Sequence, residues 1–219
     1  MTDPANLRID IVSDVVCPWC IIGYCQLKRS IEDTGIKADI YWHPFELNPQ
    51  MGDEGQNIRE HLAEKYGSTE SDSRKVRQRI TDIGADLGFA FNWDDEMRIY
   101  NTFKAHQLMH WANQSGQGKA LKDRLFSAYF TDNCDVSDMA TLCDAASDSG
   151  LDRDEAAAVL TDQRFAGMVR DKERFWVERG ISSVPAMVFQ SKHLVSGAQG
   201  VDNYTNILRH LIEAEAETA

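Results

Sequence analysis

Two cysteines, Cys17 and Cys20, stand three positions apart in the run Cys17-Pro18-Trp19-Cys20. The residues before this run have a strand pattern and those after it a helix pattern, so both thiols fall in the first turn of a helix. The unpaired N–H groups and the positive dipole end there favour the thiolate of the first cysteine. A thiolate attacks a disulfide sulfur, whereas a neutral thiol does not. The spacing predicts thiol–disulfide exchange, with Cys17 as nucleophile and Cys20 as resolving thiol.

The same pair has two other interpretations, half of a zinc site or two inert buried cysteines. A zinc site needs further ligands at metal spacing, and the sequence has no second Cys-x-x-Cys and no such pattern around His110 or Cys134. The five cysteines are an odd number, which in a reducing compartment argues against a disulfide framework. We therefore expect no metal and no organic cofactor, because the disulfide itself is the redox group.

Three further cysteines lie outside the motif. Cys25 is expected on the same helix as Cys20, as a buried small apolar residue or as a third redox partner if the helix end opens. Cys134 and Cys143 fall in a helical region, and we expect free structural thiols there.

The elements around the motif follow from periodicity. Leu7–Val16 alternates as a strand does, and a second strand is expected at Lys37–Phe45. Between them a helix is predicted from Pro18, a residue suited to a first helical turn, to Gly35. The first fifty or so residues therefore predict the order strand, helix, strand.

From about residue 57 to about residue 180 the signals are almost all helical. We expect two helices closed by Gly67 and by Gly88, a brief extended piece at Phe89–Trp93, and a helix begun by Asn101 and running through Ala112. A further helix carries Leu121, Leu125 and Tyr129, and the next is capped by Ser137. Of the last two, one is begun by the capping box of Asp152 and Glu155, and the other is marked by Phe165, Met168 and Phe175. Strands return at Ala186–Phe189 and His193–Ser196, followed by a helix at Val201–Glu213. This order is compatible with one mixed sheet that carries a helical insertion.

Composition excludes several classes of partner. The 219 residues include 35 acidic and 23 basic side chains, a net charge of -12, which repels nucleic acids and anionic membranes. No apolar stretch is long enough to span a membrane. The first sixteen residues contain no basic segment followed by an apolar one, as a secretory leader would. We expect a cytoplasmic protein.

Three stretches resemble the DsbA-like thioredoxin-fold oxidoreductases, and most of all their FrnE subfamily. They are DVVCPWCIIG at 14–23, NTFKAHQL at 101–108 and GISSVPAMVFQSKHLVSGAQ at 180–199. The resemblance implies an α/β thioredoxin fold, a mixed sheet with flanking helices, interrupted by an all-helical insertion. The implied domains are a discontinuous thioredoxin-like domain, 1–54 plus 181–219, and a helical insertion domain, 55–180.

The resemblance also implies a substrate-binding loop. It places a cis peptide bond before Pro185 and the backbone of Val184 beside the Cys17 sulfur. That backbone would pair with an extended substrate segment as an added strand. Without the resemblance, Pro185 would be only a proline at the start of a strand.

Asn101, His106 and Trp19 are weaker site candidates. Asn101 matches a polar position of the family's helical motif, and either binds substrate or glutathione in the cleft or caps a helix. His106 is expected as a core or interface histidine. Trp19 is expected at the mouth of the site, where it contacts peptide, or packed on the helical block.

Together these features favour a disulfide oxidoreductase, acting on protein or low-molecular-weight thiols and disulfides as a monomer or homodimer, with glutathione as a potential co-substrate. A second hypothesis is a glutathione-dependent enzyme similar to kappa-class transferases and hydroxychromene-carboxylate isomerases. Those enzymes have a serine near the position of Cys17, so the presence of both cysteines argues against this alternative. A third hypothesis is a chaperone or partner-binding module without redox activity.

Overall fold

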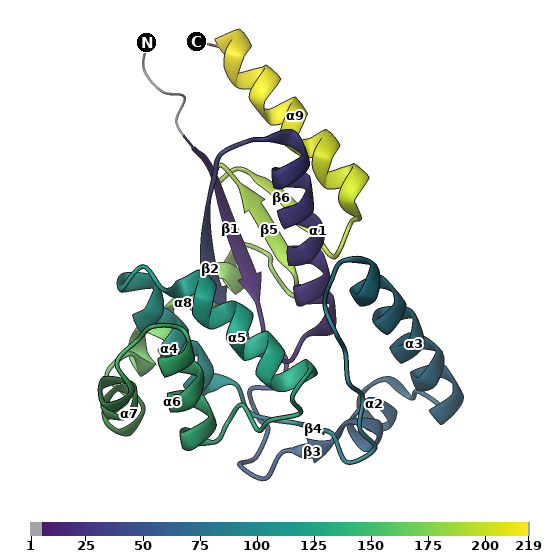
Figure 1. Ribbon diagram of the computed structural model, residues 1–219, viewed down its shortest axis with the longest axis vertical. Coiled ribbons are helices and arrows are strands. Elements are labelled where there is room, and N and C mark those ends of the chain that lie inside the picture. Colours follow the sequence, from purple (N-terminus) through teal and green to yellow (C-terminus); the bar gives the residue numbers. More distant parts are fainter. Residues whose placement is uncertain (1–5, 219) are drawn as a thin grey trace.

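A four-stranded mixed sheet forms the centre of the molecule in the computed structural model, which describes residues 6–218 (Figure 1). Strand β1 (Leu7–Ser13) pairs in parallel with β2 (Ala38–Pro44) and antiparallel with β5 (Ala186–Phe189). Strand β6 (His193–Ser196) pairs antiparallel with β5 at the edge. Two segments far apart in the sequence thus build one sheet, as predicted.

The first strand is shorter than expected. Instead of reaching Val16, β1 ends at Ser13, and the chain turns so that the N–H of Cys17 donates to the carbonyl of Asp14 at 3.3 Å. Val15 and Val16 are buried within this turn. Their apolar, β-branched side chains made the sequence of this turn resemble the end of a strand. The strand is also buried on both faces, because helices lie on either side of the sheet.

Helix α1 (Pro18–Thr34) follows the turn directly. Its N-cap is Cys17, with Pro18 in the first turn, and it ends at Gly35, whose φ of 67° gives a left-handed cap. Helix α9 (Val201–Thr218) packs beside α1 on the same face of the sheet and runs past the expected end at Glu213 (Figure 1).

The helical middle of the chain lies at the end of the sheet where β1 leads into α1 (Figure 1). Its helices are α2 (Ile58–Tyr66), α3 (Glu70–Asp86), α4 (Phe103–Gln114), α5 (Gly118–Phe130), α6 (Met139–Asp148), α7 (Arg153–Asp162) and α8 (Ala166–Glu178). Two short strands that were not expected, β3 (Gln56–Asn57) and β4 (Arg98–Ile99), pair antiparallel within this helical middle, at the bottom of the view in Figure 1. The expected helical insertion is confirmed.

Two expectations for helix starts are corrected. Asn101 precedes the N-cap of α4, which is Thr102, although the Asn101 side chain still accepts a hydrogen bond from the N–H of Phe103. Helix α6 is capped by Asp138 and not by Ser137, because the Asp138 carboxylate accepts from the N–H of Thr141. At α4 the Thr102 side chain makes no capping hydrogen bond, and at α6 the Ser137 hydroxyl donates to Asp135 instead.

The segment Phe89–Trp93 is not a strand. It carries an aromatic cluster in which Phe91 stacks on Trp93 at 5.6 Å and meets Phe130 edge-on at 5.2 Å. Its alternating aromatic pattern serves packing between loop and helix. No helix in the described residues is long and apolar enough to cross a membrane.

One continuous core joins the sheet to the helical middle. Fully buried Ile9 and Ile11 of β1, Leu27 of α1, Leu108 of α4 and Phe126 of α5 belong to the same hydrophobic cluster. The domain boundaries near residues 54 and 181 remain a prediction.

Candidate active site

The turn after β1 places both motif cysteines at the start of α1. The N–H of Cys20 donates to the carbonyl of Cys17 at 3.0 Å, which sets the two residues one helical turn apart. Cys17 is 4% exposed and Cys20 is fully buried, and both are free thiols. Cys17 is therefore the sulfur that a substrate can reach, while Cys20 lies behind it.

The Val184–Pro185 peptide bond is cis, as the resemblance implied. The Cys17 sulfur lies 3.7 Å from the carbonyl oxygen of Val184. Helix α1 approaches this loop closely because residue 23 is glycine: a Cβ there would lie 3.2 Å from Cγ of Pro185 and 3.3 Å from Cε of Met187. Gly23 therefore sets the spacing between the dithiol helix and the loop, a role that the sequence patterns did not reveal.

A cleft of about 430 Å³ opens beside Cys17, between the loop of Val184 and helices α2 and α3. Its walls are mainly apolar and include Trp19, which was expected at the mouth of the site. Tyr66 and Val76, exposed at 63% and 49%, also line it. These two side chains belong to expected helical stripes, and they face the cleft instead of the core.

Asp14 is fully buried at the base of the cysteine turn. Its Oδ2 accepts from the N–H of Leu47 at 2.8 Å, and its Oδ1 lies 3.4 Å from Nε2 of His106. Burial raises the pKa of the Asp14 carboxyl, but His106 and the Leu47 amide lower it more, so this pKa lies below its usual range. Asp14 is therefore a charged group that fixes the turn holding Cys17.

Lys122 of α5 is a site residue that sequence analysis missed. It is 1% exposed, and its Nζ lies 5.1 Å from the ring centre of Trp42 and 4.7 Å from that of Phe126. Burial lowers the pKa of Lys122 to about 8. Burial and the Cys17 sulfur raise the pKa of the Cys20 thiol, and a hydrogen bond with the Asp14 backbone and the charge of Lys122 act against that rise. Lys122 is thus a buried cation whose charge acts on the Cys20 thiol.

The other candidates lie away from the reacting sulfurs. Asn101 does not line the cleft; its amide donates to the carbonyl of Met51 at 3.3 Å. His106 is 2% exposed and confirmed as a core histidine. Burial raises the pKa of Cys25 to about 11.

The two cysteines of the helical middle are free thiols, Cys143 buried and Cys134 half-buried. Within residues 6–218, no group of three or more His, Cys, Asp or Glu side chains is arranged to hold a metal ion. The structure thus brings Cys17, Cys20, Trp19 and Val184 together and leaves Asn101 outside.

Known proteins resemble this chain over most of its length. The family described as DSBA-like thioredoxin domain matches residues 8–209. A crystal structure of a probable DsbA oxidoreductase from Streptomyces coelicolor has 30% identity and a TM-score of 0.87, covering 94% of this chain and 89% of that chain. The uncharacterized protein YwbO of Bacillus subtilis is 23% identical over 90% of this chain and 93% of its own length. A 2-hydroxychromene-2-carboxylate isomerase shares the fold, with a TM-score of 0.72, 13% identity, and coverage of 97% of this chain and 99% of that chain.

Proposed function

Since the chain belongs to the DSBA-like thioredoxin domain family, we propose that it is a thiol–disulfide oxidoreductase that uses the Cys17–Cys20 dithiol. The observation that carries this proposal is the position of the Cys17 sulfur, at the N-terminus of α1, beside the Val184 carbonyl and on the wall of an apolar cleft. The narrower assignment to the FrnE subfamily and a cytoplasmic location are part of the same proposal.

Reduction of a substrate disulfide takes two steps. The Cys17 thiolate attacks one substrate sulfur, the substrate S–S bond breaks, and the departing thiolate takes up a proton. The Cys20 sulfur then gives up its proton and attacks Cys17, which forms the Cys17–Cys20 disulfide and releases the second substrate thiol. Two electrons pass from the dithiol to the substrate. Oxidation of a substrate dithiol is the same sequence in reverse.

The second step needs a deprotonated Cys20 in a buried place. Burial opposes the thiolate, and the nearby ammonium of Lys122 favours it. Lys122, with its pKa lowered to about 8, carries a positive charge at neutral pH that offsets the new negative charge. We assign Lys122 as a positioning charge for the resolving step.

The cleft favours a substrate with apolar groups next to its disulfide. Trp19, Tyr66 and Val76 offer apolar surface, and the Val184 backbone lies beside the attacking sulfur, where an extended segment could pair with it. We propose protein or low-molecular-weight disulfides and thiols as substrates, for a protein that is a monomer or homodimer and binds no nucleic acid and no membrane. No organic cofactor or metal takes part in these steps.

Variants in which one cysteine is replaced by serine test this proposal. In the reduced C20S variant, attack by Cys17 still occurs but no resolving thiol follows, so a mixed disulfide between Cys17 and a disulfide-bonded peptide should accumulate. C17S should form no adduct and reduce no substrate, and C25S should behave as the wild type. The readout is intact mass after acid quench. Adduct formation by C17S, or wild-type turnover by C20S, would refute the assigned roles.

A further inference from the structure

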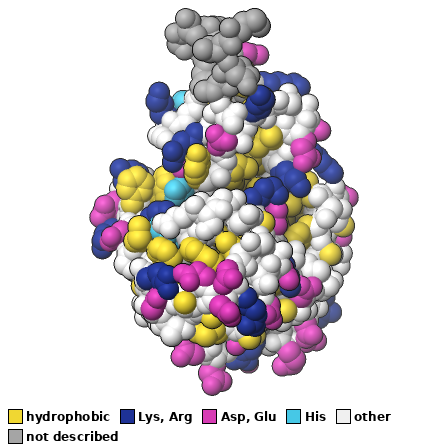
Figure 2. All heavy atoms as spheres, turned by 60° about the vertical axis from the view of Figure 1, so that its left-hand side comes forward, with side chains coloured by type: hydrophobic (Ala, Val, Ile, Leu, Met, Phe, Trp, Pro, Cys, Tyr) yellow, Lys and Arg dark blue, Asp and Glu magenta, His cyan; other side chains and the backbone are white. Residues whose placement is uncertain are grey.

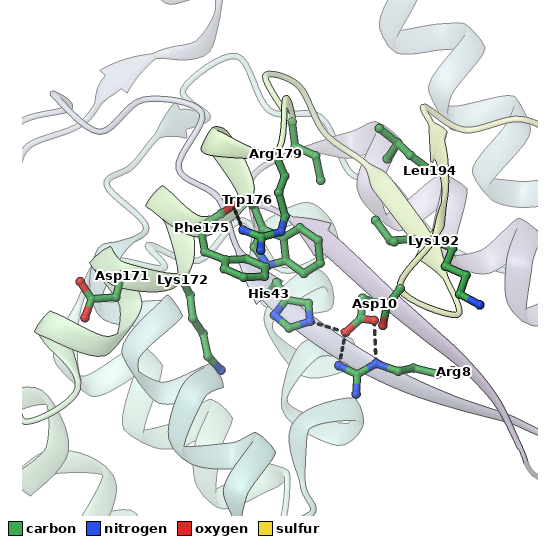
Figure 3. Close-up of a pocket in the computed structure, with 13 residues that line it drawn as sticks. Arg8, Asp10, His43, Asp171, Lys172, Phe175, Trp176, Arg179, Lys192 and Leu194 are labelled. Atoms are coloured by element: carbon green, nitrogen blue, oxygen red, sulfur yellow. Dashed lines mark hydrogen bonds and ion pairs between the residues drawn. The ribbon is translucent and has the colours of Figure 1, made fainter.

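A second cavity, of about 730 Å³, lies between α8 and the sheet, away from the dithiol (Figure 3). Its lining comes from α8 and the residues just after it, from β1, β2, β5 and β6, and from the turn between β5 and β6, and it includes neither Cys17 nor Cys20. Its volume is that of a pocket for a small organic molecule. The proposed redox chemistry gives this cavity no role.

The cavity has an apolar wall that other side chains leave partly open. Trp176 packs on Ile181 and Val188 in a small separate core, and Phe175 meets the Trp176 ring edge-on at 5.0 Å. Phe175 remains 42% exposed, and Leu194 on the opposite side of the cavity is 48% exposed. The Arg179 guanidinium lies over one face of the Phe175 ring, and the rest of this wall presents apolar surface to solvent.

The buried acid of the cavity already has its counter-charges. Asp10 is 1% exposed; its oxygens accept from Nε and Nη2 of Arg8 at 2.8 and 2.7 Å and lie 2.7 Å from Nε2 of His43 (Figure 3). The other acid of the lining, Asp171, pairs with Arg174. Neither carboxylate is therefore available to neutralise further cations.

Three cations of the lining stay without an acidic partner among the described side chains: Lys172, Arg179 and Lys192, here called the cationic rim. Lys172 is half-buried, and burial lowers its pKa. Arg179 donates only to the carbonyl of Phe175, at 3.2 Å, and its guanidinium lies 3.4 Å from the Phe175 ring centre.

This positive region belongs to a chain whose net charge is -12. On the side of the molecule that carries α8, hydrophobic and Lys or Arg side chains lie next to one another, with Asp and Glu side chains among them (Figure 2). Of the cationic rim, Lys172 is half-buried, whereas Arg179 and Lys192 are exposed. Burial beside apolar surface disfavours the unpaired charge of Lys172, and an anion next to it would offset that cost. The combination suits a ligand that has both an apolar body and a negative group.

We propose that this cavity binds a small organic anion, whose apolar ring system packs on the wall of Phe175 and Trp176 and whose carboxylate, sulfonate or phosphate group meets the cationic rim. An aromatic ring gains stacking and area burial on this wall. The negative group exchanges its hydration for charge-assisted hydrogen bonds from lysine and arginine.

The probe for this proposal is 8-anilinonaphthalene-1-sulfonate, and its uncharged counterpart is N-phenyl-1-naphthylamine. Binding is followed by the indole N–H signal of Trp176 in two-dimensional NMR, assigned with W176F. We expect a saturable shift at Trp176, whereas Trp19 and Trp93, which line the other cleft, report binding there. The uncharged compound should bind in the cavity beside Trp176 at least about 10-fold more weakly, since it cannot make the charge-assisted contact with the cationic rim.

The matched variants are K172Q/R179Q and R74Q/K75Q. Both remove two positive charges, but the second pair lies on the exposed side of α3. We expect K172Q/R179Q to lose at least about 10-fold in affinity at Trp176, and R74Q/K75Q to match the wild type. An unmoved Trp176 signal, equal losses in the two variants, or equal binding of the uncharged compound would overturn the proposal. Circular dichroism verifies that both variants fold.

Discussion

The Cys17 sulfur lies 3.7 Å from the carbonyl oxygen of Val184, although the two residues are 167 positions apart in the chain. The antiparallel register of β1 and β5 produces this contact, because Val12 pairs with Ala186. The residues that follow β1 and those that precede β5 therefore meet at one end of these two central strands. The whole helical middle is inserted between them in the sequence.

Replacing Lys122 tests whether its charge supports the resolving step. In K122M the Cys20 thiolate loses a nearby cation, so release of substrate from the mixed disulfide should slow by about 10-fold at pH 7, the effect of about 1.4 kcal/mol. The pH profile of this step should move to higher pH. Stopped-flow reduction of a fluorescent peptide disulfide measures it.

K119M is the matched control for this experiment. Lys119 stands on the same helix, is exposed and pairs with Asp123, so its loss should leave the rate and its pH profile unchanged. A K122M profile that coincides with that of K119M would show that Lys122 has only a packing role.

Asp10 should contribute stability in a defined pH range. Burial raises its pKa, but hydrogen bonds from His43 and Arg8 outweigh that effect and lower it to about 2. A carboxylate with a lowered folded pKa stabilises fully above its unfolded value of about 3.9, and this contribution fades as pH falls toward 2. D10N should therefore lower the free energy of unfolding by about 2 kcal/mol at pH 6, with a smaller difference at pH 3.

Urea unfolding of D10N and of wild type at pH 6, 4 and 3 measures this difference. D33N, which changes an exposed aspartate on α1, should track the wild type throughout. A D10N difference that stays constant over this pH range would contradict the assignment.

Replacing Asn101 distinguishes a role in stabilising the start of α4 from a role in substrate binding. Its side chain accepts from the N–H of Phe103 at 2.9 Å and donates to Met51, outside the cleft. N101A should lose about 1 kcal/mol of stability, as the loss of one hydrogen bond does, with KM unchanged. Chemical denaturation and steady-state kinetics decide between the roles: a raised KM at wild-type stability would place Asn101 in substrate binding.

The cysteines should differ in reactivity toward iodoacetamide. At pH 8 a thiol with a pKa of about 11, as burial gives Cys25, is only about one-thousandth ionised. The reduced protein should therefore carry its first label on Cys17, as peptide mass mapping would show. Labelling of Cys25 first would mean that the end of α1 opens in solution.

Local sequence patterns were sufficient to predict the elements that carry the dithiol. A period-two strand, a proline in a first helical turn and a closing glycine predicted β1 and α1, and two apolar runs separated by a hairpin-length link predicted β5 and β6. These features are local, so neighbouring residues determine them. The predicted end of β1 was wrong because a buried turn and a strand have the same apolar composition.

The site residues missed were those whose role depends on packing between distant elements. Lys122 stands one turn before Leu125 and Phe126, and a lysine at an apolar stripe position was the available signal. Gly23 lies in the middle of α1, where a glycine weakens a helix unless another element approaches. The exposure of Val76 could not be predicted from the sequence either, because apolar residues on a cleft wall and on a core face recur with the same helical period.

The most direct test of the account is the redox equilibrium of the Cys17–Cys20 pair. The purified protein is equilibrated across buffers of reduced and oxidised glutathione, quenched by alkylation and analysed by intact mass and peptide mapping. The account predicts one two-electron transition between a dithiol and an intramolecular Cys17–Cys20 disulfide, unchanged in C25S. Absence of this disulfide at every buffer ratio, or a stable glutathione adduct on Cys17, would contradict it and favour a glutathione-dependent enzyme.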